Sequence, residues 1–412
     1  MFLEQTVKRN SELVRLAFSL HQKGVVAPDS YLIDVDTFLQ NAAEMLACSK
    51  RNDVKLYFML KQLGRNPYLA RELMRLGYSG AVAVDYKEAA VMMEHGIPIG
   101  NVGHLVQIPT ALVRQIVSCR PEVITVYSEE KIRQIDQAAS ELGVIQEILL
   151  RVYGDGDMIY SGQTAGFKLN TLKELVSRIV GSNPHVRIAG VTSFPCYLYD
   201  EELDDIIPTA NLQTVKKAVA ILEAQGVICR IINTPSATCC RTIERMKQDG
   251  GNCGEPGHGF SGTTPMHAAH EQPEKPCVVY ISEVSHNFEG RGYCFGGGHY
   301  RRSHMKNALV GENLLSARHM EVIPPSDDSI DYHFGLSKEC PVGQTVVMAF
   351  RYQVFVTRSD VVLVTGLERE RRGLKESMTA RAEKNEKAIY RYCTGWIWNR
   401  GHERCPNREA GG

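Results

Sequence analysis

The sequence predicts an α/β protein, a (β/α)8 TIM barrel followed by a smaller, mainly β domain. Short apolar runs alternate with amphipathic segments as far as residue 256, which is typical of parallel βα units. After about residue 272 the pattern changes to alternating runs such as TVVMAF and YQVFVTRSDVVLVTG, which are typical of strands. We therefore expect a barrel over 1–272, a β domain over 273–367 and a charged tail of unknown role over 368–412.

Eight apolar runs mark the predicted barrel strands. The first, VKLYFML at 54–60, has Lys55 as its one polar residue and indicates a buried strand. The other runs are AVAVD (81–85), GNVGHLV (100–106), VITVYS (123–128), EILLRVY (147–153), RIAGVTSF (187–194), VICRIIN (227–233) and the weaker GNCGEP (251–256). An open doubly wound sheet is the structural alternative, but no GxGxxG turn follows the first run.

Helix-like segments such as PYLARELMRLG, DYKEAAVMMEHG, TLKELVSRIVG and LQTVKKAVAILEAQG lie between these runs. Several end on glycine, which most easily takes the left-handed conformation that ends a helix. The glycines expected to end helices are Gly77, Gly96, Gly143, Gly181, Gly226 and Gly250.

Lys61 stands directly after the first apolar run. A lysine in such a place is usually solvated, with its stem on apolar surface and its ammonium in water. In a (β/α)8 barrel, however, catalytic residues lie where the strands end. The barrel prediction therefore puts Lys61 at the mouth of the active site, where burial would keep its amine neutral often enough to act as nucleophile or base.

The loops after the seventh and eighth runs are rich in small residues. INTPSATCC brings Ser236 and Thr238 to the start of a helix-like segment, and GEPGHGFSGTTP contains four glycines around Glu255. Barrels commonly bind phosphate with these two loops, because small residues let backbone N–H groups approach an anion. Two ordinary surface turns are the alternative. Together with Lys61, the two loops and Glu255 favour pyridoxal 5'-phosphate as cofactor.

Composition narrows the class of partner and the compartment. Lys plus Arg and Asp plus Glu both total 47, so the formal net charge of zero gives no reason to expect nucleic acid or an anionic membrane surface. No apolar run approaches the roughly 18 residues of a membrane helix, and the start of the chain lacks a signal-peptide core. Twelve scattered cysteines without a CxxC pair favour reduced thiols in a cytoplasm and show no zinc-ligand spacing.

The sequence resembles the alanine-racemase-like, fold-type III pyridoxal-phosphate enzymes, and within them the YhfX group, over roughly residues 1 to 367. The segments that carry the resemblance are YLIDVD, LKQLGRNP, GYSGAVAVDYKEA, GHLVQIP, PSATC, EPGHGFSGTTP, YCFGGGHYRR and VFVTRSDVVLV. The resemblance implies that Lys61 holds the cofactor covalently and that Ser236, Gly257 and His258 bind its phosphate. It also implies that Glu255 faces the pyridine nitrogen, that residues 31–36 join the β domain, and that two chains share active sites in a homodimer.

Other assignments follow from the same resemblance. The second proton carrier of a racemase would be a tyrosine from the partner's β domain, here Tyr293 or Tyr300, with Tyr332 as a third candidate and Phe295 unable to serve. Ser193, in TSFPC, stands where the family has a ring-stacking histidine. His104 faces either the cofactor or the core. FRYQVFVTRSD lacks the ligand pair of the metal-dependent relatives, so no metal is expected.

The expected function is catalysis at Cα of a small amino acid, most simply racemisation, in a cytoplasmic enzyme. Three alternatives remain open from the sequence. A decarboxylase or a D-amino-acid lyase or aldolase would use the same scaffold, and a non-catalytic cofactor carrier would lack the β domain. A cofactor-free Schiff-base aldolase would need a barrel lysine but not Glu255.

Overall fold

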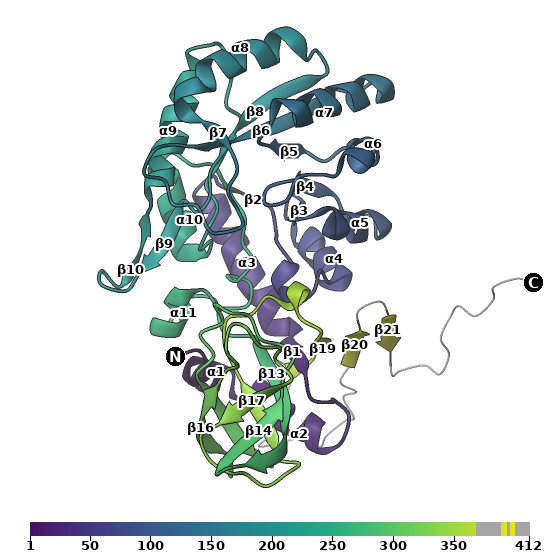
Figure 1. Cartoon of the computed structure of the whole chain (residues 1–412), viewed down its shortest axis with the longest axis vertical. Helices are drawn as coiled ribbons and strands as arrows, with labels where there is room; N and C mark the ends of the chain where they lie inside the picture. Colours follow the sequence, from purple (N-terminus) through teal and green to yellow (C-terminus); the bar gives the residue numbers. More distant parts are fainter. Residues whose placement is uncertain (368–388, 394–395, 400–412) are drawn as a thin grey trace, which may run out of the picture.

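The N-terminal part of the chain is a closed parallel barrel (Figure 1). The computed structural model describes residues 1–367, 389–393 and 396–399. Its parallel sheet runs in the order β2-β12-β11-β8-β6-β5-β4-β3, with β7 paired to β6, and a bridge between Phe58 and Ala81 joins the two ends of this order. The predicted (β/α)8 barrel is therefore confirmed.

Each predicted apolar run overlaps one barrel strand, including the weak run at 251–256. The strands are β2 (Lys55–Leu56), β3 (Ala81–Ala83), β4 (Ile99–Val102), β5 (Val123–Val126), β6 (Gln146–Tyr153), β7 (Phe167–Lys168), β8 (Val186–Thr192), β11 (Ile231–Asn233) and β12 (Cys253–Gly254). Alternation along β2 sends Leu56 and Phe58 to the core under the helices and Tyr57 and Met59 into the barrel interior. Lys61 follows this run as the first residue of the 3-10 turn η1 (Lys61–Leu63), and its side chain lines the cavity at the strand ends.

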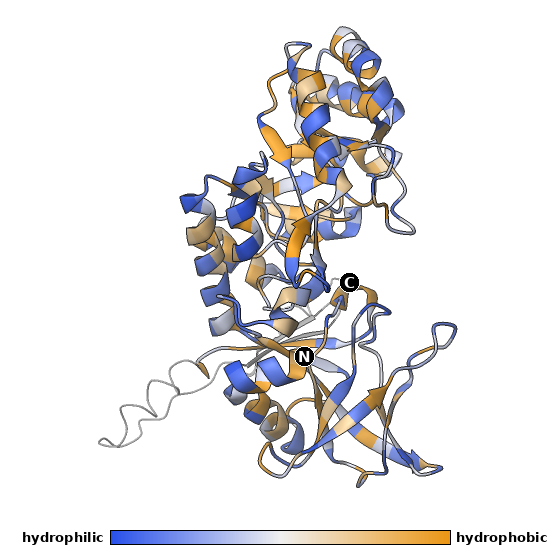
Figure 2. Cartoon of the chain, turned by 90° about the vertical axis from the view of Figure 1, so that its left-hand side faces the viewer, coloured by the Kyte–Doolittle hydropathy of each residue, from blue (hydrophilic) through white to orange (hydrophobic). Residues whose placement is uncertain are grey.

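Helices surround the barrel, with hydrophilic residues on their outer faces (Figures 1 and 2). They are α3 (Val35–Arg51), α4 (Pro67–Leu76), α5 (Tyr86–Glu94), α6 (Val113–Ser118), α7 (Glu129–Leu142), α8 (Leu172–Ser182), α9 (Ala210–Glu223) and α10 (Cys240–Gln248). Local sequence fixes several starts, because the side chains of Asn66, Asp85 and Ser128 accept hydrogen bonds from backbone N–H groups of the first turn. No helix in the described ranges is long and apolar enough to cross a bilayer.

The glycine predictions hold at all but one position. Gly77 and Gly143 are left-handed caps, and Gly96, Gly226 and Gly250 have positive φ just after their helices. The prediction for Gly181 was wrong, because that residue lies inside α8, which continues to Ser182 and ends at Asn183. Helix α8 runs one residue past the glycine, so Gly181 lies near the end of the helix but does not cap it.

The C-terminal domain is a closed antiparallel barrel. Pairings run from β13 through β14, β17, β16, β15 and β18 back to β13. Its strands are β13 (Val278–Phe288), β14 (Arg291–Phe295), β15 (Asn307–Gly311), β16 (Arg318–Ile323), β17 (His333–Leu336), β18 (Thr345–Met348) and β19 (Asp360–Val364). Strand β1 (Ser30–Asp34) lies between β13, to which it is antiparallel, and β19, to which it is parallel.

The N-terminal helices also belong with this β sheet. The two helices α1 (Phe2–Arg9) and α2 (Ser11–Gln22) bury residues such as Leu13 and Phe18 against Ile281, Val347 and Val362. These helices, which the sequence analysis counted with the barrel, thus pack against the β domain. Of residues 31–36, which the resemblance assigned to that domain, 31–34 do join its sheet, and α3 begins at Val35. In Figure 1 the N-terminus lies beside this domain, below the barrel.

Shorter elements complete the chain. They are the hairpin β9 (Tyr197–Asp200) and β10 (Asp205–Pro208), α11 (Pro265–Ala269), and the 3-10 turns η1 (Lys61–Leu63), η2 (Thr110–Leu112), η3 (Leu169–Thr171) and η4 (Val354–Val356). Most of the expected charged tail lies outside the described residues. Its described part, β20 (Ile389–Cys393) and β21 (Trp396–Asn399), pairs with β19 as an antiparallel hairpin.

Candidate active site

Lys61 lines a cavity of about 260 Å³ at the carboxyl ends of the barrel strands. Burial lowers the pKa of its ammonium to about 8, a shift that the nearby Glu88 carboxylate opposes. The ammonium nitrogen lies 5.8 Å from the ring centre of Phe355, which reaches the cavity from η4 of the β domain. An appreciable fraction of Lys61 is therefore the neutral, nucleophilic amine near neutral pH.

Glu255 is held in the same cavity with one oxygen free. Its Oε1 accepts hydrogen bonds from Asn101 Nδ2 at 2.8 Å and Asn233 Nδ2 at 2.9 Å, while Oε2 has no hydrogen-bond partner. Thr125 Oγ1 donates to Asn101 Oδ1 at 2.8 Å, which fixes the orientation of that amide. Burial raises the pKa of the Glu255 carboxyl to about 7, against the opposing effect of the two amides. Oε2 can therefore accept a hydrogen bond from an N–H group of a ligand bound in the cavity.

The two loops predicted to bind phosphate do meet at this cavity. Ser236, Thr238, Gly257 and His258 all line it. Ser236 has a φ of 121°, in the region that favours glycine, and such strain persists mainly where the surrounding structure enforces it. A Cβ on Gly257 would lie 2.6 Å from Gln62 Nε2, so only glycine leaves this approach open. The loops therefore present backbone and hydroxyl groups to the cavity.

Buried polar atoms without partners surround this space. They are Gln62 Oε1, both ring nitrogens of His104, Gln163 Oε1, Thr238 Oγ1, Glu255 Oε2, Arg351 Nε and Gln353 Oε1. A buried polar atom without a hydrogen bond costs about 1–3 kcal/mol. So many around one cavity indicate a site built for a polar ligand, and they fit a phosphorylated pyridine aldehyde.

The β domain of the same chain supplies one wall. Tyr300 and Arg302 line the cavity, and Arg302 Nε donates to Tyr300 Oη at 2.9 Å. The guanidinium of Arg302 lies 4.4 Å from the ring centre of Tyr160, which comes from the loop after β6. Tyr300 thus reaches the Lys61 cavity of its own chain, whereas the resemblance implied a tyrosine from a partner.

The other candidate aromatic residues lie elsewhere in this chain. Tyr293, on β14, stacks on His286 with ring centres 5.0 Å apart and does not line the cavity. Tyr332 is exposed beside Arg358, and Phe295 is exposed next to His333. Because Tyr293 and Tyr332 were expected to serve a partner chain, their assignments stay predictions.

His104 and Ser193 take different positions. His104 lines the cavity, its Nε2 lies 3.8 Å from Glu255 Oε2, and its ring meets Phe194 edge-on at 5.7 Å. Burial lowers the pKa of His104 well below its usual value, so the ring is neutral. Ser193 Oγ instead accepts from Asn211 Nδ2 at 3.1 Å, and the neighbouring Phe194 lines the cavity in its place.

Sequence reasoning missed several residues of this site. Asn233 ends a predicted run, so its position alone would have identified it as a candidate, whereas Asn101 is the second residue of its run and gave no such signal. Glu88 is buried near Lys61, with Oε2 accepting from Val84 N at 2.9 Å and burial raising its carboxyl pKa to about 7. Arg302 and Arg351 come from the β domain, and no local pattern indicates that this domain docks at the barrel mouth.

Comparison with known proteins agrees with this fold and site. The chain matches the family described as "Alanine racemase, N-terminal domain" over residues 33–265, and "YhfX-like, C-terminal domain" over residues 279–374. It therefore belongs to the alanine racemase N-terminal domain family.

Within that family, the chain is 45% identical over 372 residues to the YhfX protein of Escherichia coli (strain K12), covering 90% of this chain and 95% of that one. Its fold is similar to D-threo-3-hydroxyaspartate dehydratase from Delftia sp. HT23, with a TM-score of 0.63, 15% identity and coverage of 83% and 95%. It is also similar to alanine racemase of Clostridium difficile 630, with a TM-score of 0.59, 15% identity and coverage of 83% and 97%. Dehydratase and racemase share the architecture, so the fold alone does not select the reaction.

Proposed function

We propose that the chain is a pyridoxal-phosphate-dependent enzyme acting at Cα of an amino acid, with racemisation as its reaction. The observation that carries the proposal is Lys61, whose pKa burial lowers to about 8, in one cavity with Glu255 and the two small-residue loops. Structural lysines seldom combine these three features. Membership of the alanine racemase N-terminal domain family supports the same chemistry.

The residues of the cavity divide between parts of the cofactor. Lys61 would hold the aldehyde carbon covalently, and Ser236, Thr238, Gly257 and His258 would bind the phosphate through hydroxyl, ring and backbone donors. Oε2 of Glu255 would accept from the protonated pyridine nitrogen, since Oε1 is already occupied. When bound, the pyridinium ring supplies an electron sink for a carbanion at Cα.

Proton transfer then falls to two side chains of the cavity. Lys61 Nζ, released when the substrate amine takes its place on the aldehyde carbon, would take the Cα proton on one face, since its pKa of about 8 in the cofactor-free chain suits a general base near neutral pH. Tyr300 Oη would return a proton from another wall, held in place by the hydrogen bond from Arg302 Nε. The neutral His104 ring would position the cofactor beside Glu255.

The rival reactions differ in their products. Decarboxylation or cleavage would change the carbon skeleton, whereas racemisation leaves it intact. A carrier protein would hold the cofactor without exchanging any Cα proton, and the β-domain residues at the cavity argue against that role. A cofactor-free aldolase would leave Glu255 without a use.

A homodimer and a cytoplasmic location remain part of the proposal. Free thiols such as Cys48, Cys196 and Cys253 agree with a cytoplasmic location.

The test has two stages. The protein is loaded with pyridoxal phosphate, reduced with borohydride and analysed by mass spectrometry, and the cofactor should be attached at Lys61. Loaded protein is then incubated with L- and D-amino acids in deuterium oxide, with Lys61→Ala as control. Deuterium at Cα together with the opposite enantiomer supports the racemase, whereas a label on another residue would contradict the assignment of Lys61. A changed skeleton would contradict racemisation alone.

A further inference from the structure

The Lys61 cavity contains two guanidinium groups without acidic partners. Arg302 and Arg351 both line it, and neither forms an ion pair with an acidic side chain of the described residues. Nε of Arg351 is buried and has no hydrogen bond. Arg302 is exposed at the rim of the cavity, so water can solvate its charge. The Arg351 guanidinium is more enclosed, and an enclosed charge without a partner is strongly destabilising, so the cavity is expected to receive an anionic group at Arg351.

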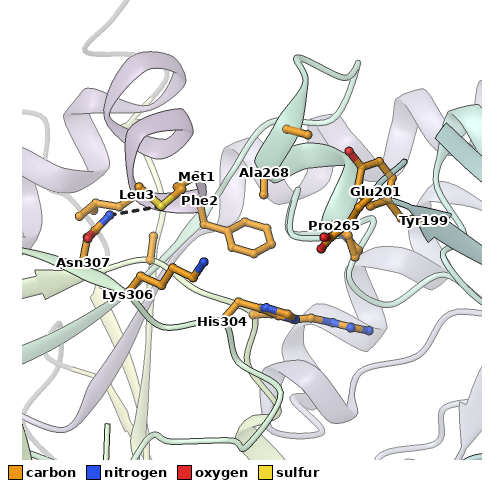
Figure 3. A pocket seen from close by; sticks show the side chains of 13 residues that line it. Met1, Phe2, Leu3, Tyr199, Glu201, Pro265, Ala268, His304, Lys306 and Asn307 are labelled. Carbon is orange, nitrogen blue, oxygen red and sulfur yellow. Dashed lines mark hydrogen bonds between the residues drawn. The ribbon is translucent and has the colours of Figure 1, made fainter. Parts of the chain in front are cut away.

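A second cavity of about 420 Å³ adjoins the first (Figure 3). The two cavities share Tyr199, Pro265 and Arg351 in their walls. Figure 3 shows the Lys306 amino group projecting into the second cavity between Phe2 and His304, with Glu201 on the far side. Burial lowers the pKa of His304, while Glu201 opposes that shift. Arg351 therefore stands where the reaction cavity opens into a larger space lined by basic residues.

The anionic groups of the cofactor and of an amino-acid substrate can be assigned to the binding groups of the cavity one by one. The loops after β11 and β12 offer neutral hydroxyl and backbone donors for the cofactor phosphate, as at other phosphate sites built from small residues. Any amino-acid substrate brings one α-carboxylate, and Arg302, held against Tyr300 and Tyr160, presents a planar fork suited to it. One guanidinium, that of Arg351, then remains.

We propose that the substrate is an amino acid whose side chain ends in a second anionic group, and that Arg351 binds this group at the opening into the second cavity. The inference rests on the proposed function, since it assumes that an amino acid reacts at Lys61. Carboxylate and phosphonate side chains share the required chemistry, because both accept paired hydrogen bonds from a guanidinium.

Calorimetric titration of the cofactor-loaded protein tests the proposal. The probes are glutamate, 2-aminoadipate and 2-amino-5-phosphonopentanoate, each compared with the neutral glutamine and norleucine. The wild type should bind at least one acid on the order of 100-fold tighter than the neutral probes, because a desolvated charge pair is at stake. Which acid binds tightest distinguishes carboxylate from phosphonate and sets the length.

Four variants separate the roles. Arg351→Gln should remove the preference for acids and leave neutral probes unchanged, whereas Arg302→Gln should weaken all probes because all carry an α-carboxylate. Lys306→Gln, which removes a charge from the second cavity alone, should change the affinity for acids less than about threefold, since a more exposed charge is screened by water and salt. Arg351→Lys keeps the charge without the fork and should retain part of the preference.

Several results would overturn the proposal. Acids and neutral probes binding alike would do so, as would an equal effect of Lys306→Gln and Arg351→Gln. If Arg351→Gln weakens binding of pyridoxal phosphate but not of pyridoxal, Arg351 binds the cofactor phosphate instead. Failure of the proposed function is distinct, because borohydride would then leave no cofactor on Lys61 of the wild type.

Discussion

Burial of the Lys61 ammonium has a cost that stability measurements can detect. The pKa of Lys61 falls from 10.5 to about 8 in the folded, cofactor-free chain because of burial. The folded state therefore binds a proton less tightly than the unfolded state, so protonated Lys61 destabilises the fold at pH values below about 8. With about 1.4 kcal/mol for each pKa unit, the penalty at pH 7 is on the order of 3 kcal/mol.

Replacing Lys61 by methionine should remove that penalty. We expect Lys61→Met to raise the free energy of unfolding of the cofactor-free protein by about 3 kcal/mol at pH 7. The gain should shrink as pH rises from about 8 towards 10.5, where the unfolded lysine also loses its proton. Urea unfolding of both proteins at pH 7 and pH 9.5 measures the difference. Lys50→Met, on an exposed side of α3, is the control and should change little. An unchanged stability at pH 7 would mean that Lys61 is solvated.

Among the residues of the site, the sequence could predict those that follow a barrel strand in the chain. Lys61, Ser236, Glu255 and Gly257 all follow barrel strands, so the barrel prediction alone directs them to one end. Asn233 ends a predicted run and could have been included on the same ground, whereas Asn101 is the second residue of its run. The distances that give Glu255 its two amide partners depend on the closed barrel and lie beyond sequence patterns.

At the level of secondary-structure elements, two glycines differ in how much space surrounds them: one lies in a crowded barrel strand and the other in an open helix. Gly190 lies in β8, where a Cβ would stand 1.8 Å from the carbonyl oxygen of Ile231 on β11, and its φ is 152°. Gly181 lies inside α8 with nothing within 4 Å of a Cβ. The first glycine permits the close approach of two barrel strands, whereas the second only adds flexibility to a helix.

Alanine at each position should therefore have opposite effects. Gly190→Ala must push β8 away from β11, and we expect a loss of more than about 3 kcal/mol in unfolding free energy, comparable to overpacking a core. Gly181→Ala should gain about 0.5–1 kcal/mol, the helix propensity difference. Thermal and urea unfolding of the two variants measure both values. A tolerated Gly190→Ala would contradict the strand contact, and a destabilising Gly181→Ala would contradict the continuous helix.

Barrel strands were predictable because strands buried on both faces appear as short apolar runs. Helix ends were predictable where glycine takes positive φ, as at Gly77 and Gly143. The N-terminal helices were not placed correctly, because an amphipathic face fits a barrel or a β sheet equally well. The partner of the apolar face of α2, the sheet around Ile281 and Val362, is fixed only by contacts far apart in sequence.

For the whole molecule, the question is which chain completes each active site. The β domain of one chain lines the Lys61 cavity of the same chain with Tyr300, Arg302, Arg351 and Phe355. This arrangement depends on how the two domains dock, which no local sequence pattern reveals. The sequence-based expectation was that a tyrosine of a partner β domain would serve instead. The two arrangements predict different behaviour of mixed oligomers.

Mixing two inactive variants distinguishes these arrangements. Lys61→Ala and Tyr300→Phe proteins, each lacking one of the two groups that inversion needs, are unfolded together, refolded and assayed for formation of the opposite enantiomer. If Lys61 and Tyr300 act within one chain, as their shared cavity indicates, no mixed oligomer contains a complete site and racemisation stays at the level of the separate variants. If a partner supplied Tyr300, half of the random dimers would carry one complete site, and about a quarter of wild-type racemisation would return. Refolded wild type is the control for recovery. Restored racemisation would therefore show that Tyr300 acts across the interface and that the wall of the cavity is rearranged on dimerisation.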